Sequence, residues 1–387
     1  MLSDFDREVD RRGTNSLKWD VAADELPMWV ADMDFPTAPA VLETIGRKLA
    51  SGVLGYGIVP EEFGRAVADW WTRRHDFAMD PEWVTFCTGV VPALSSMVRT
   101  LTEPGDHVLI TPPVYNIFTN SILNSGRKVL ASNLSFEHGQ YSVDLDDLEE
   151  KLARPRTTLF ILCNPQNPTG TVWSASTLAT IGHLASRHGV TVVSDEIHCD
   201  LTLPGVRYTP FASASPVCAA TSITCVSPSK AFNLAGLQTA SVVIPDADLR
   251  ARVVTGLNRD EVAEPNIIAI EAAIAAFTEG EAWLDALRGY LASNREHATR
   301  VIGETLPSLR VVDAEATYLL WIDCSAITDD ATELALEIRR TTGLILSAGA
   351  GYGSAGAAFL RLNLACPRPR LDDGLDRLRR GLEGLRP

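Results

Sequence analysis

A lysine flanked by two serines follows an apolar run in the second half of the chain. The run is Ser222–Val226, and Ser227, Ser229 and Lys230 come just after it. A lysine amine can act as a nucleophile toward a carbonyl carbon, and hydroxyl groups can bind an anion. The segment therefore suits an anion beside a reactive amine. A surface lysine is the alternative while the segment is taken alone.

Two further polar groups follow apolar runs in the same way. Asp195 comes after Thr191–Ser194, and a carboxylate at the end of a buried strand is costly unless a cation or donor pairs with it. Asn167 lies in the polar loop after Thr157–Cys163 and could donate a fixed hydrogen bond. The alternatives are a helix N-cap for the aspartate and plain turn chemistry for the asparagine.

Two more segments could contact a ligand at its anionic end and its ring. Gly89, Val90 and Val91 open a helical stretch after Val84–Cys87, and the free amides at a helix start favour a phosphate. Tyr115 follows two prolines that stiffen a turn, so its ring could serve as a stacking surface. An ordinary strand–helix turn and a core tyrosine are the alternatives.

The elements that must position these residues alternate between apolar runs and helical patterns from about residue 84 to 244. This alternation predicts an α/β fold, with a mostly parallel central sheet and helices on both faces. Ala175–His188, for example, is amphipathic and stops at Gly189. The predicted strands are Val84–Cys87, His107–Thr111, Lys128–Ala131, Thr157–Cys163, Thr191–Ser194, Ser222–Val226 and Ala240–Ile244.

Ligands of open α/β sheets bind beyond the carboxyl ends of the strands, where these five polar segments converge. Together they offer a phosphate nest, an aromatic plate, an amide donor, a carboxylate and a lysine. Pyridoxal 5′-phosphate (PLP) needs all five. Its aldehyde takes a lysine, its pyridine nitrogen takes a carboxylate, its phosphate takes N–H and hydroxyl donors, and its ring stacks.

The rest of the chain predicts a second, smaller unit. Helical patterns cover 266–278 and 281–306, and the strands and helices after them read as an α+β domain. We expect an N-terminal segment (1–45) packed on that small domain, a large PLP-binding domain (46–285) and a small C-terminal α+β domain (286–387).

Composition excludes several other classes of protein. The 387 residues carry 34 Lys and Arg against 49 Asp and Glu, a net charge of −15, which argues against nucleic-acid binding and anionic membranes. No apolar run reaches the roughly 18 residues of a membrane helix. The seven cysteines form no C-x-x-C pair, so neither a disulfide framework nor a metal site is indicated. We expect a cytoplasmic protein.

The motifs NPQNPTG (164–170), SDEIH (194–198) and SPSKAFNLAGL (227–237) resemble those of fold-type I, PLP-dependent enzymes of the class I and II aminotransferase superfamily. The resemblance covers essentially the whole chain. Within the superfamily, the sequence is most similar to the cystathionine β-lyase or C–S lyase branch. That similarity rests on RRGTNSLKWD (11–20), LPMWVADMDFPTAP (26–39), the DEIH tetrapeptide and FLRLNLACPR (359–368).

The resemblance implies a role for each cofactor-facing residue. Lys230 would carry PLP as a Schiff base and shuttle the Cα proton, Asp195 would pair with the pyridinium, and Asn167 would bond the phenolic oxygen. The remaining contacts would be stacking by Tyr115, phosphate binding by Val90, Val91, Ser227 and Ser229, and a contact from His198. The chain departs from ordinary aminotransferases, which have tyrosine at position 198 and arginine at position 238, where this chain has His198 and Gln238.

On the substrate side, Arg361 matches the arginine that binds the α-carboxylate. In Phe359–Leu364 the leucines share one strand face, while Arg361 and Asn363 share the other. A solvent-facing arginine on an edge strand is the alternative. Trp29 would line the substrate pocket, with packing as its alternative. Tyr56 matches a tyrosine that reaches the phosphate of a neighbouring subunit, which implies a homodimer with shared active sites.

The resemblance implies α,β-elimination of a thiol from an L-cysteine S-conjugate such as cystathionine, leaving pyruvate and ammonia. Transamination of an amino acid is the main alternative, because both reactions need the same lysine, aspartate and arginine. A non-catalytic regulator with the same fold is the third hypothesis. Against it, the chain keeps Lys230 and has no basic helix-turn-helix-like segment.

Overall fold

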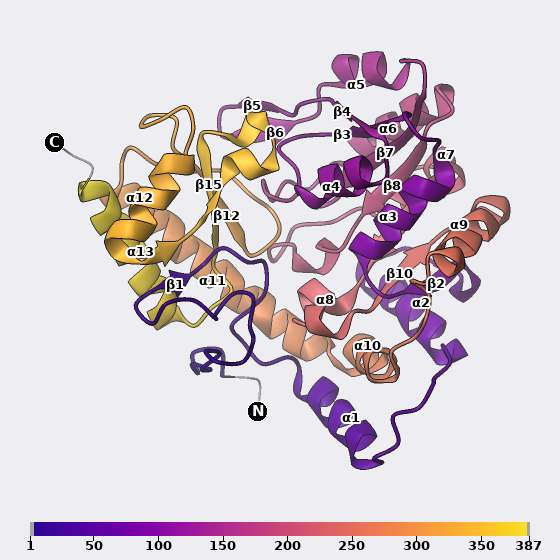
Figure 1. The fold of residues 1–387 in the computed structure, drawn as a ribbon, viewed down its shortest axis with the longest axis horizontal. Helices are drawn as coiled ribbons and strands as arrows, with labels where there is room; N and C mark the ends of the chain where they lie inside the picture. The colour runs from indigo at the N-terminus through magenta and orange to yellow at the C-terminus, as the bar shows by residue number, and fades with distance from the viewer. Residues whose placement is uncertain (1–3, 385–387) are drawn as a thin grey trace.

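A seven-stranded sheet forms the centre of the computed structural model, which describes residues 4–384 (Figure 1). Its strand order is β2-β10-β9-β8-β7-β3-β4, and β10 alone runs antiparallel to its neighbours. The strands are β2 (Val84–Cys87), β3 (His107–Ile110), β4 (Lys128–Ala131), β7 (Thr157–Cys163), β8 (Thr191–Asp195), β9 (Ser222–Val226) and β10 (Ala240–Val243). The predicted fold class is confirmed, and each predicted strand lies within one residue of its observed bounds.

Helices cover both faces of this sheet. Alternate side chains of β7 separate onto two apolar clusters: Leu159 and Ile161 join one, Phe160 and Leu162 the other. The first cluster includes α3 (Val90–Leu101), α4 (Ile117–Asn124) and α9 (Ala247–Arg259). The second includes α5 (Leu145–Leu152), α6 (Ala175–Arg187) and α7 (Pro216–Thr221). Burial on both faces explains why the central strands lack polar alternation.

Two consecutive helices lead from this sheet to a smaller one. They are α10 (Ile267–Glu279) and the 25-residue α11 (Glu281–Thr305), close to the two helical patterns in the sequence. The small sheet is antiparallel in the order β11-β12-β15-β14. Its elements are β11 (Arg310–Val311), β12 (Leu319–Asp323), β14 (Ser347–Ala348) and β15 (Phe359–Asn363), with α12 (Thr332–Thr342) and α13 (Arg368–Glu383) packed beside them.

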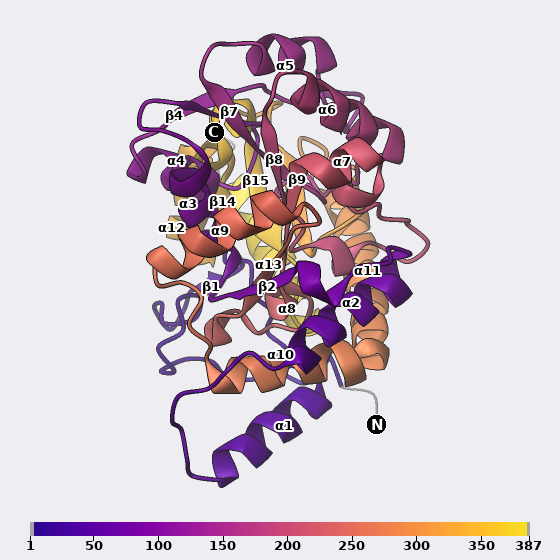
Figure 2. The same ribbon diagram turned by 90° about the vertical axis from the view of Figure 1, so that its right-hand side faces the viewer.

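The N-terminal part of the chain contacts both units. Strand β1 (Leu26–Pro27) pairs in parallel with β13 (Leu344–Ile345) beside the small sheet. Helix α1 (Pro39–Ala50) instead packs on α10, at the lower edge of Figure 2. The predicted boundary after residue 45 lies inside this helix. Helix α2 (Glu61–His75) follows, and a separate hairpin joins β5 (Ser135–Glu137) to β6 (Gln140–Ser142).

The outermost residues of the predicted first and last domains, 1–3 and 385–387, lie outside the described residues. Among residues 4–384, no helix combines the length and the apolar character that a membrane crossing requires.

Candidate active site

A cavity of about 780 Å³ lies beyond the carboxyl ends of β2, β7, β8 and β9, with the small sheet on its other side. Its lining brings together most of the side chains predicted from the sequence. They are Trp29, Val90, Val91, Tyr115, Asn167, Asp195, His198, Ser229, Lys230 and Arg361. Ser227 and Tyr56 are not part of this lining.

Lys230 lies in the short helix α8 (Pro228–Ala231) that directly follows β9. Its side chain is half-buried, and Nζ donates a hydrogen bond to the carbonyl oxygen of Ala31 at 2.6 Å. Burial, with Arg361 nearby, lowers the pKa of the Lys230 ammonium to about 8. A larger neutral fraction near physiological pH makes this amine a better nucleophile and base than an ordinary lysine. The surface-lysine alternative is wrong.

Asp195 ends β8 as a carboxylate without an ion-pair partner among the described residues. Its Oδ1 accepts a hydrogen bond from the amide of Ile197 at 3.2 Å. The helix N-cap alternative is wrong, because the next helix, a 3₁₀ turn over Cys199–Leu201, has His198 at its N-cap. Burial raises the pKa of Asp195 to about 6, although Ile197 and Lys230 oppose the rise. A buried acid with so little compensation is suited to a positively charged group on a ligand.

Arg361 reaches the cavity from β15, which lies between β12 and β14 rather than at the sheet edge. Only 5% of the residue is exposed, so the alternative of a solvent-facing edge arginine is wrong. Nη1 donates to Asn167 Oδ1 at 3.2 Å and Nη2 to the Trp29 carbonyl at 2.8 Å. The guanidinium lies 4.9 Å from the ring centroid of Tyr352, and its buried Nε has no partner.

Two rings border the centre of the cavity. His198 is buried, and its Nδ1 has no hydrogen-bond partner. Burial, with Lys230 and Arg361 nearby, lowers the pKa of His198 to about 3, so the imidazole is neutral. Tyr115 is half-buried and packs edge-on against Phe118 with 6.0 Å between ring centroids. It packs against the apolar cluster that includes α3 and α4 and also lines the cavity, so it is not solely a core tyrosine.

The start of α3 borders another part of the cavity. Its first-turn amides at Val90 and Val91 have no intrahelical acceptor, and Pro92 carries no N–H. Ser229 lines the cavity nearby. Ser227 lies outside the lining because its hydroxyl caps α8: Oγ donates to the Thr239 carbonyl at 2.7 Å and accepts from the Ser229 amide at 3.0 Å.

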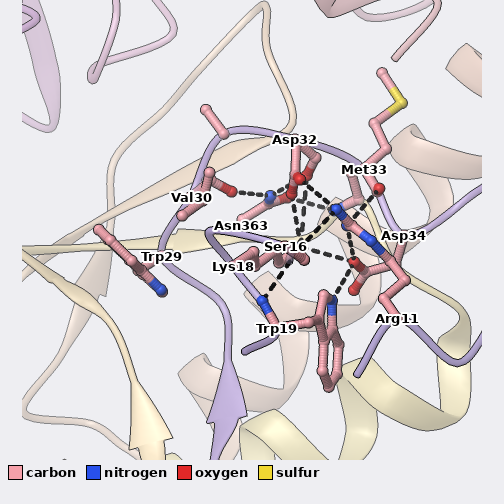
Figure 3. A network of polar contacts seen from close by, with 12 residues as sticks. Arg11, Ser16, Lys18, Trp19, Trp29, Val30, Asp32, Met33, Asp34 and Asn363 are labelled. Atoms are coloured by element: carbon pink, nitrogen blue, oxygen red, sulfur yellow. Dashed lines mark hydrogen bonds and ion pairs between the residues drawn. The ribbon is translucent and has the colours of Figure 1, made fainter. Parts of the chain in front are cut away.

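A buried polar network fixes residues 29–34 against the cavity (Figure 3). Asp34 Oδ1 accepts hydrogen bonds from Lys18 at 3.0 Å, Trp19 Nε1 at 2.8 Å and Arg11 at 2.9 Å, and Arg370 lies 3.2 Å from Oδ2. Nearby, Asn363 Nδ2 donates to the carbonyls of residues 30 and 32. The backbone that binds Lys230 and Arg361 is therefore itself held by side chains from distant segments.

Tyr56 lies apart from this cavity and is fully exposed. It belongs to the segment 51–60, which borders a separate, smaller hollow with Pro265–Ile268. The contact of Tyr56 with the phosphate of a neighbouring subunit stays a prediction.

One cluster of potential metal ligands also lies elsewhere. His75, Cys199 and Asp200 place ligand atoms within 4.8 Å of one another. Asp200 Oδ1, however, already accepts a hydrogen bond from Trp70 Nε1 and contacts His75 Nε2, each at 3.0 Å. These hydrogen bonds hold the side chains together within the protein, so the cluster has a structural role.

Comparison with known proteins decides the family. The model of "Aminotransferase class I and II" matches residues 25–378. This chain belongs to the class I and II aminotransferase family. The family resemblance predicted from the sequence is thereby confirmed.

Within the class I and II aminotransferase family, similar proteins include carbon–sulfur lyases. The chain is 43% identical to cystathionine beta-lyase PatB of Bacillus subtilis over 98% of its own length and 99% of that protein. A structure of cystalysin from Treponema denticola, which contains a pyridoxal 5′-phosphate cofactor, matches with a TM-score of 0.96, 32% identity and full coverage of both chains. The PLP-bound C–S lyase of Staphylococcus hominis matches with a TM-score of 0.91, 32% identity and 98% coverage of both. The C–S lyase branch of the resemblance is also confirmed.

Three features of this family member escaped the sequence analysis. Thr239 lines the cavity, and its buried Oγ1 has no hydrogen-bond partner. Tyr352 packs on the Arg361 guanidinium. Ala31 contributes only its carbonyl oxygen, which any residue could supply. Thr239 directly follows Gln238, one of the two positions at which the chain departs from ordinary aminotransferases, and that neighbour was the one signal in the sequence.

Proposed function

We propose that this chain is a PLP-dependent carbon–sulfur β-lyase that eliminates a thiol from an L-cysteine S-conjugate. One water is consumed, and the products are the thiol, pyruvate and ammonia. The observation that carries the proposal is the cavity that holds Lys230, Asp195 and Arg361, in a chain 43% identical to a cystathionine β-lyase. The same three groups serve transamination, and the C–S lyase relatives favour elimination.

Groups without partners in the cavity fit the chemistry of PLP. The amides at Val90 and Val91, together with Thr239 Oγ1 and Ser229, offer donors for a phosphate. Gln238 supplies no cation there, so neutral donors carry that contact. Asp195 lacks a cation, which the protonated pyridine nitrogen would provide. Asn167 Oδ1 accepts from Arg361, so its Nδ2 would donate to the phenolic oxygen, and Tyr115 and His198 would contact the ring.

Bound PLP supplies an electron sink that makes the substrate's Cα–H bond acidic. The protein's own contributions are binding, orientation and proton transfer. Arg361 binds the substrate α-carboxylate, and its contacts to Asn167 and the Trp29 carbonyl fix the plane of the guanidinium. Lys230 then accepts the Cα proton at Nζ, a role that its lowered pKa favours. Loss of that proton allows the Cβ–S bond to break, and the electron pair leaves with sulfur.

A product assay tests this function. Purified enzyme incubated with PLP and either L-cystathionine or S-butyl-L-cysteine, without a keto acid, should release pyruvate, ammonia and thiol in equal amounts. Lys230→Ala should lower that rate at least about a hundredfold and abolish the visible Schiff-base absorbance. Amino transfer to an added keto acid, with no thiol released, would instead establish an aminotransferase.

We also propose that the enzyme works as a homodimer in the cytoplasm. Exposed apolar side chains concentrate between the end of α1 and α2, an arrangement typical of a protein interface. They are Leu49, Val53, Leu54, Tyr56, Ile58 and Val59. In the dimer, Tyr56 contacts the phosphate in the partner's cavity. Analytical ultracentrifugation should show a dimer for both the wild type and Tyr56→Phe. A PLP titration should give a lower affinity for the variant than for the wild type.

A further inference from the structure

The part of the cavity that remains for the substrate's sulfur substituent contains no charge. In the proposed function, the start of α3, Ser229, Gln238 and Thr239 would form the phosphate end, and Asp195, Asn167, His198 and Tyr115 would surround the ring; all of these residues line the cavity. Arg361 takes the α-carboxylate. The remaining walls come from the N-terminal segment, from the start of α4 and from residues 346–352. Their main side chains are Leu17, Trp29, Val30, Ile117, Leu346 and Tyr352.

Among the lining residues, all of them in the described part of the chain, only Asp195, Lys230 and Arg361 are charged. In the proposed function, Asp195 pairs with the pyridine nitrogen of PLP, Lys230 accepts the Cα proton, and Arg361 binds the α-carboxylate. A second carboxylate or ammonium on the sulfur substituent therefore finds no oppositely charged side chain. A charge moved from water to an apolar wall without a partner is strongly disfavoured. An alkyl or aryl group in the same place gains free energy from burial.

The segment that the proposed dimer brings to the partner's cavity adds no charge. The exposed segment that carries Tyr56 is Ser-Gly-Val-Leu-Gly-Tyr-Gly-Ile-Val-Pro (51–60), which contains no ionisable side chain other than the tyrosine. Its apolar residues would extend the uncharged wall. The cavity lining and segment 51–60 therefore both favour an uncharged, apolar substituent on the sulfur.

We infer that this site selects L-cysteine S-conjugates whose sulfur carries a neutral, apolar alkyl or aryl group, and that it discriminates against a second charged group such as the distal end of cystathionine. The inference rests on the proposed lyase function and specifies its substrate class. The reaction is unchanged: the Cβ–S bond breaks, and the apolar thiol leaves.

Matched substrates test the inference on the PLP-loaded enzyme. S-butyl-L-cysteine and S-(2-carboxyethyl)-L-cysteine have sulfur substituents of similar length and differ in the terminal carboxylate. We expect kcat/KM for pyruvate release to be at least tenfold higher for the butyl compound, with cystathionine on the low side. Equal values, or a preference for either charged substrate, would overturn the inference and leave the lyase function standing. No pyruvate from any of the three would refute the lyase function itself.

A binding measurement separates recognition from chemistry. L-norleucine and L-2-aminoadipate have no thiol to release, and they too differ by a terminal carboxylate. Norleucine should compete with the substrate at least tenfold more strongly, and its binding should change the fluorescence of Trp29. Comparable inhibition constants would contradict an uncharged substituent site.

Leu17 offers a way to reverse the preference, because it lines the cavity and 77% of its surface is exposed. Leu17→Arg places a cation at the mouth and should improve kcat/KM for the carboxyethyl substrate at least fivefold relative to the butyl one. Leu336→Arg is the matched control: it adds the same charge at an exposed leucine of α12, away from the cavity. An unchanged substrate ratio in Leu17→Arg would mean that the lining charge does not set specificity, and the inference would fail.

Discussion

Each of the two walls of the cavity holds a buried aspartate, and the two carboxylates have opposite surroundings. The wall at the strand ends carries Asp195, and among residues 4–384 this carboxylate has no ion-pair partner, while His198 and Thr239 each leave a buried polar atom without a hydrogen bond. The wall formed by residues 29–34 has no regular secondary structure and leaves Trp29 Nε1 and Asp32 Oδ1 without a hydrogen bond in the described part of the chain. Its Asp34 carboxylate, however, accepts from three side chains and lies beside a fourth. Buried groups without partners are available to a ligand, whereas buried groups with full sets of partners hold a backbone in place.

A charged aspartate therefore destabilises the folded protein in one wall and stabilises it in the other. Burial raises the pKa of Asp195 to about 6, so its charged form costs free energy unless a cation binds beside it. Burial acts in the same direction on Asp34, but Lys18, Trp19 and Arg370 outweigh it and hold the pKa of Asp34 below its usual value. Neutralising each aspartate in turn therefore tests the comparison.

Asp34→Asn should have the largest effect on stability. The amide leaves the Lys18 ammonium, which is 1% exposed, without its closest counter-charge, and breaking a buried pair typically costs about 3–5 kcal/mol. Because the folded-state pKa of Asp34 lies below the unfolded value of about 3.9, its contribution is present above that pH and is lost as the pH falls further. Urea unfolding at pH 7 measures the loss. A free energy of unfolding within about 1 kcal/mol of wild type would break the comparison.

Arg361 joins the two walls, since it binds Asn167 on one and the Trp29 carbonyl on the other. Arg361→Lys keeps the charge but cannot form both contacts and a two-point bond to a carboxylate. We expect kcat/KM to fall about a hundredfold, mainly through KM, with the PLP absorbance unchanged. Steady-state pyruvate release on S-butyl-L-cysteine measures this. A KM equal to that of the wild type would show that another group binds the α-carboxylate.

Asp195→Asn should act in the opposite direction to Asp34→Asn. In PLP-free protein, the folded state binds a proton at Asp195 more tightly than the unfolded state does, so the charge lowers stability as the pH rises from about 4 to about 6. The variant should therefore gain up to about 2 kcal/mol at pH 8 and lose that pH dependence.

Its affinity for PLP should fall, because the pyridinium loses its counter-charge. Urea unfolding of the PLP-free protein at pH 5 and pH 8, together with PLP titration, measures both effects. If the variant is less stable than the wild type at pH 8, Asp195 has a compensating partner that the comparison leaves out.

The sequence predicted the wall at the strand ends better than the wall of residues 29–34. The first depends on residues close together in the chain, and the second on contacts between segments far apart in it. Asp195 ends an apolar strand, and Asn167 and Lys230 each lie four residues beyond one, so the strand pattern alone placed them at one sheet edge. The fold class followed from the same alternation. The pairing of Asp34 with Lys18 and with Arg370 depends on how distant segments pack, which no local pattern encodes. Ser227 illustrates the same limit: its position was predicted, but its hydroxyl is bonded to Thr239, across a loop.

Thr239 provides the smallest test, at the strand-end wall. Its Oγ1 is buried without a partner, while its carbonyl accepts from Ser227, so Thr239→Val keeps the shape and removes only the unsatisfied hydroxyl. PLP-free protein should be as stable as the wild type or up to about 1 kcal/mol more stable. PLP affinity should fall severalfold, because a neutral donor matters more where Gln238 replaces a cation. Thr239→Ser keeps the hydroxyl and should retain the affinity. A loss of stability in Thr239→Val, with PLP affinity unchanged, would mean that the hydroxyl serves the protein rather than the ligand, and the contrast between the walls would not extend to this residue.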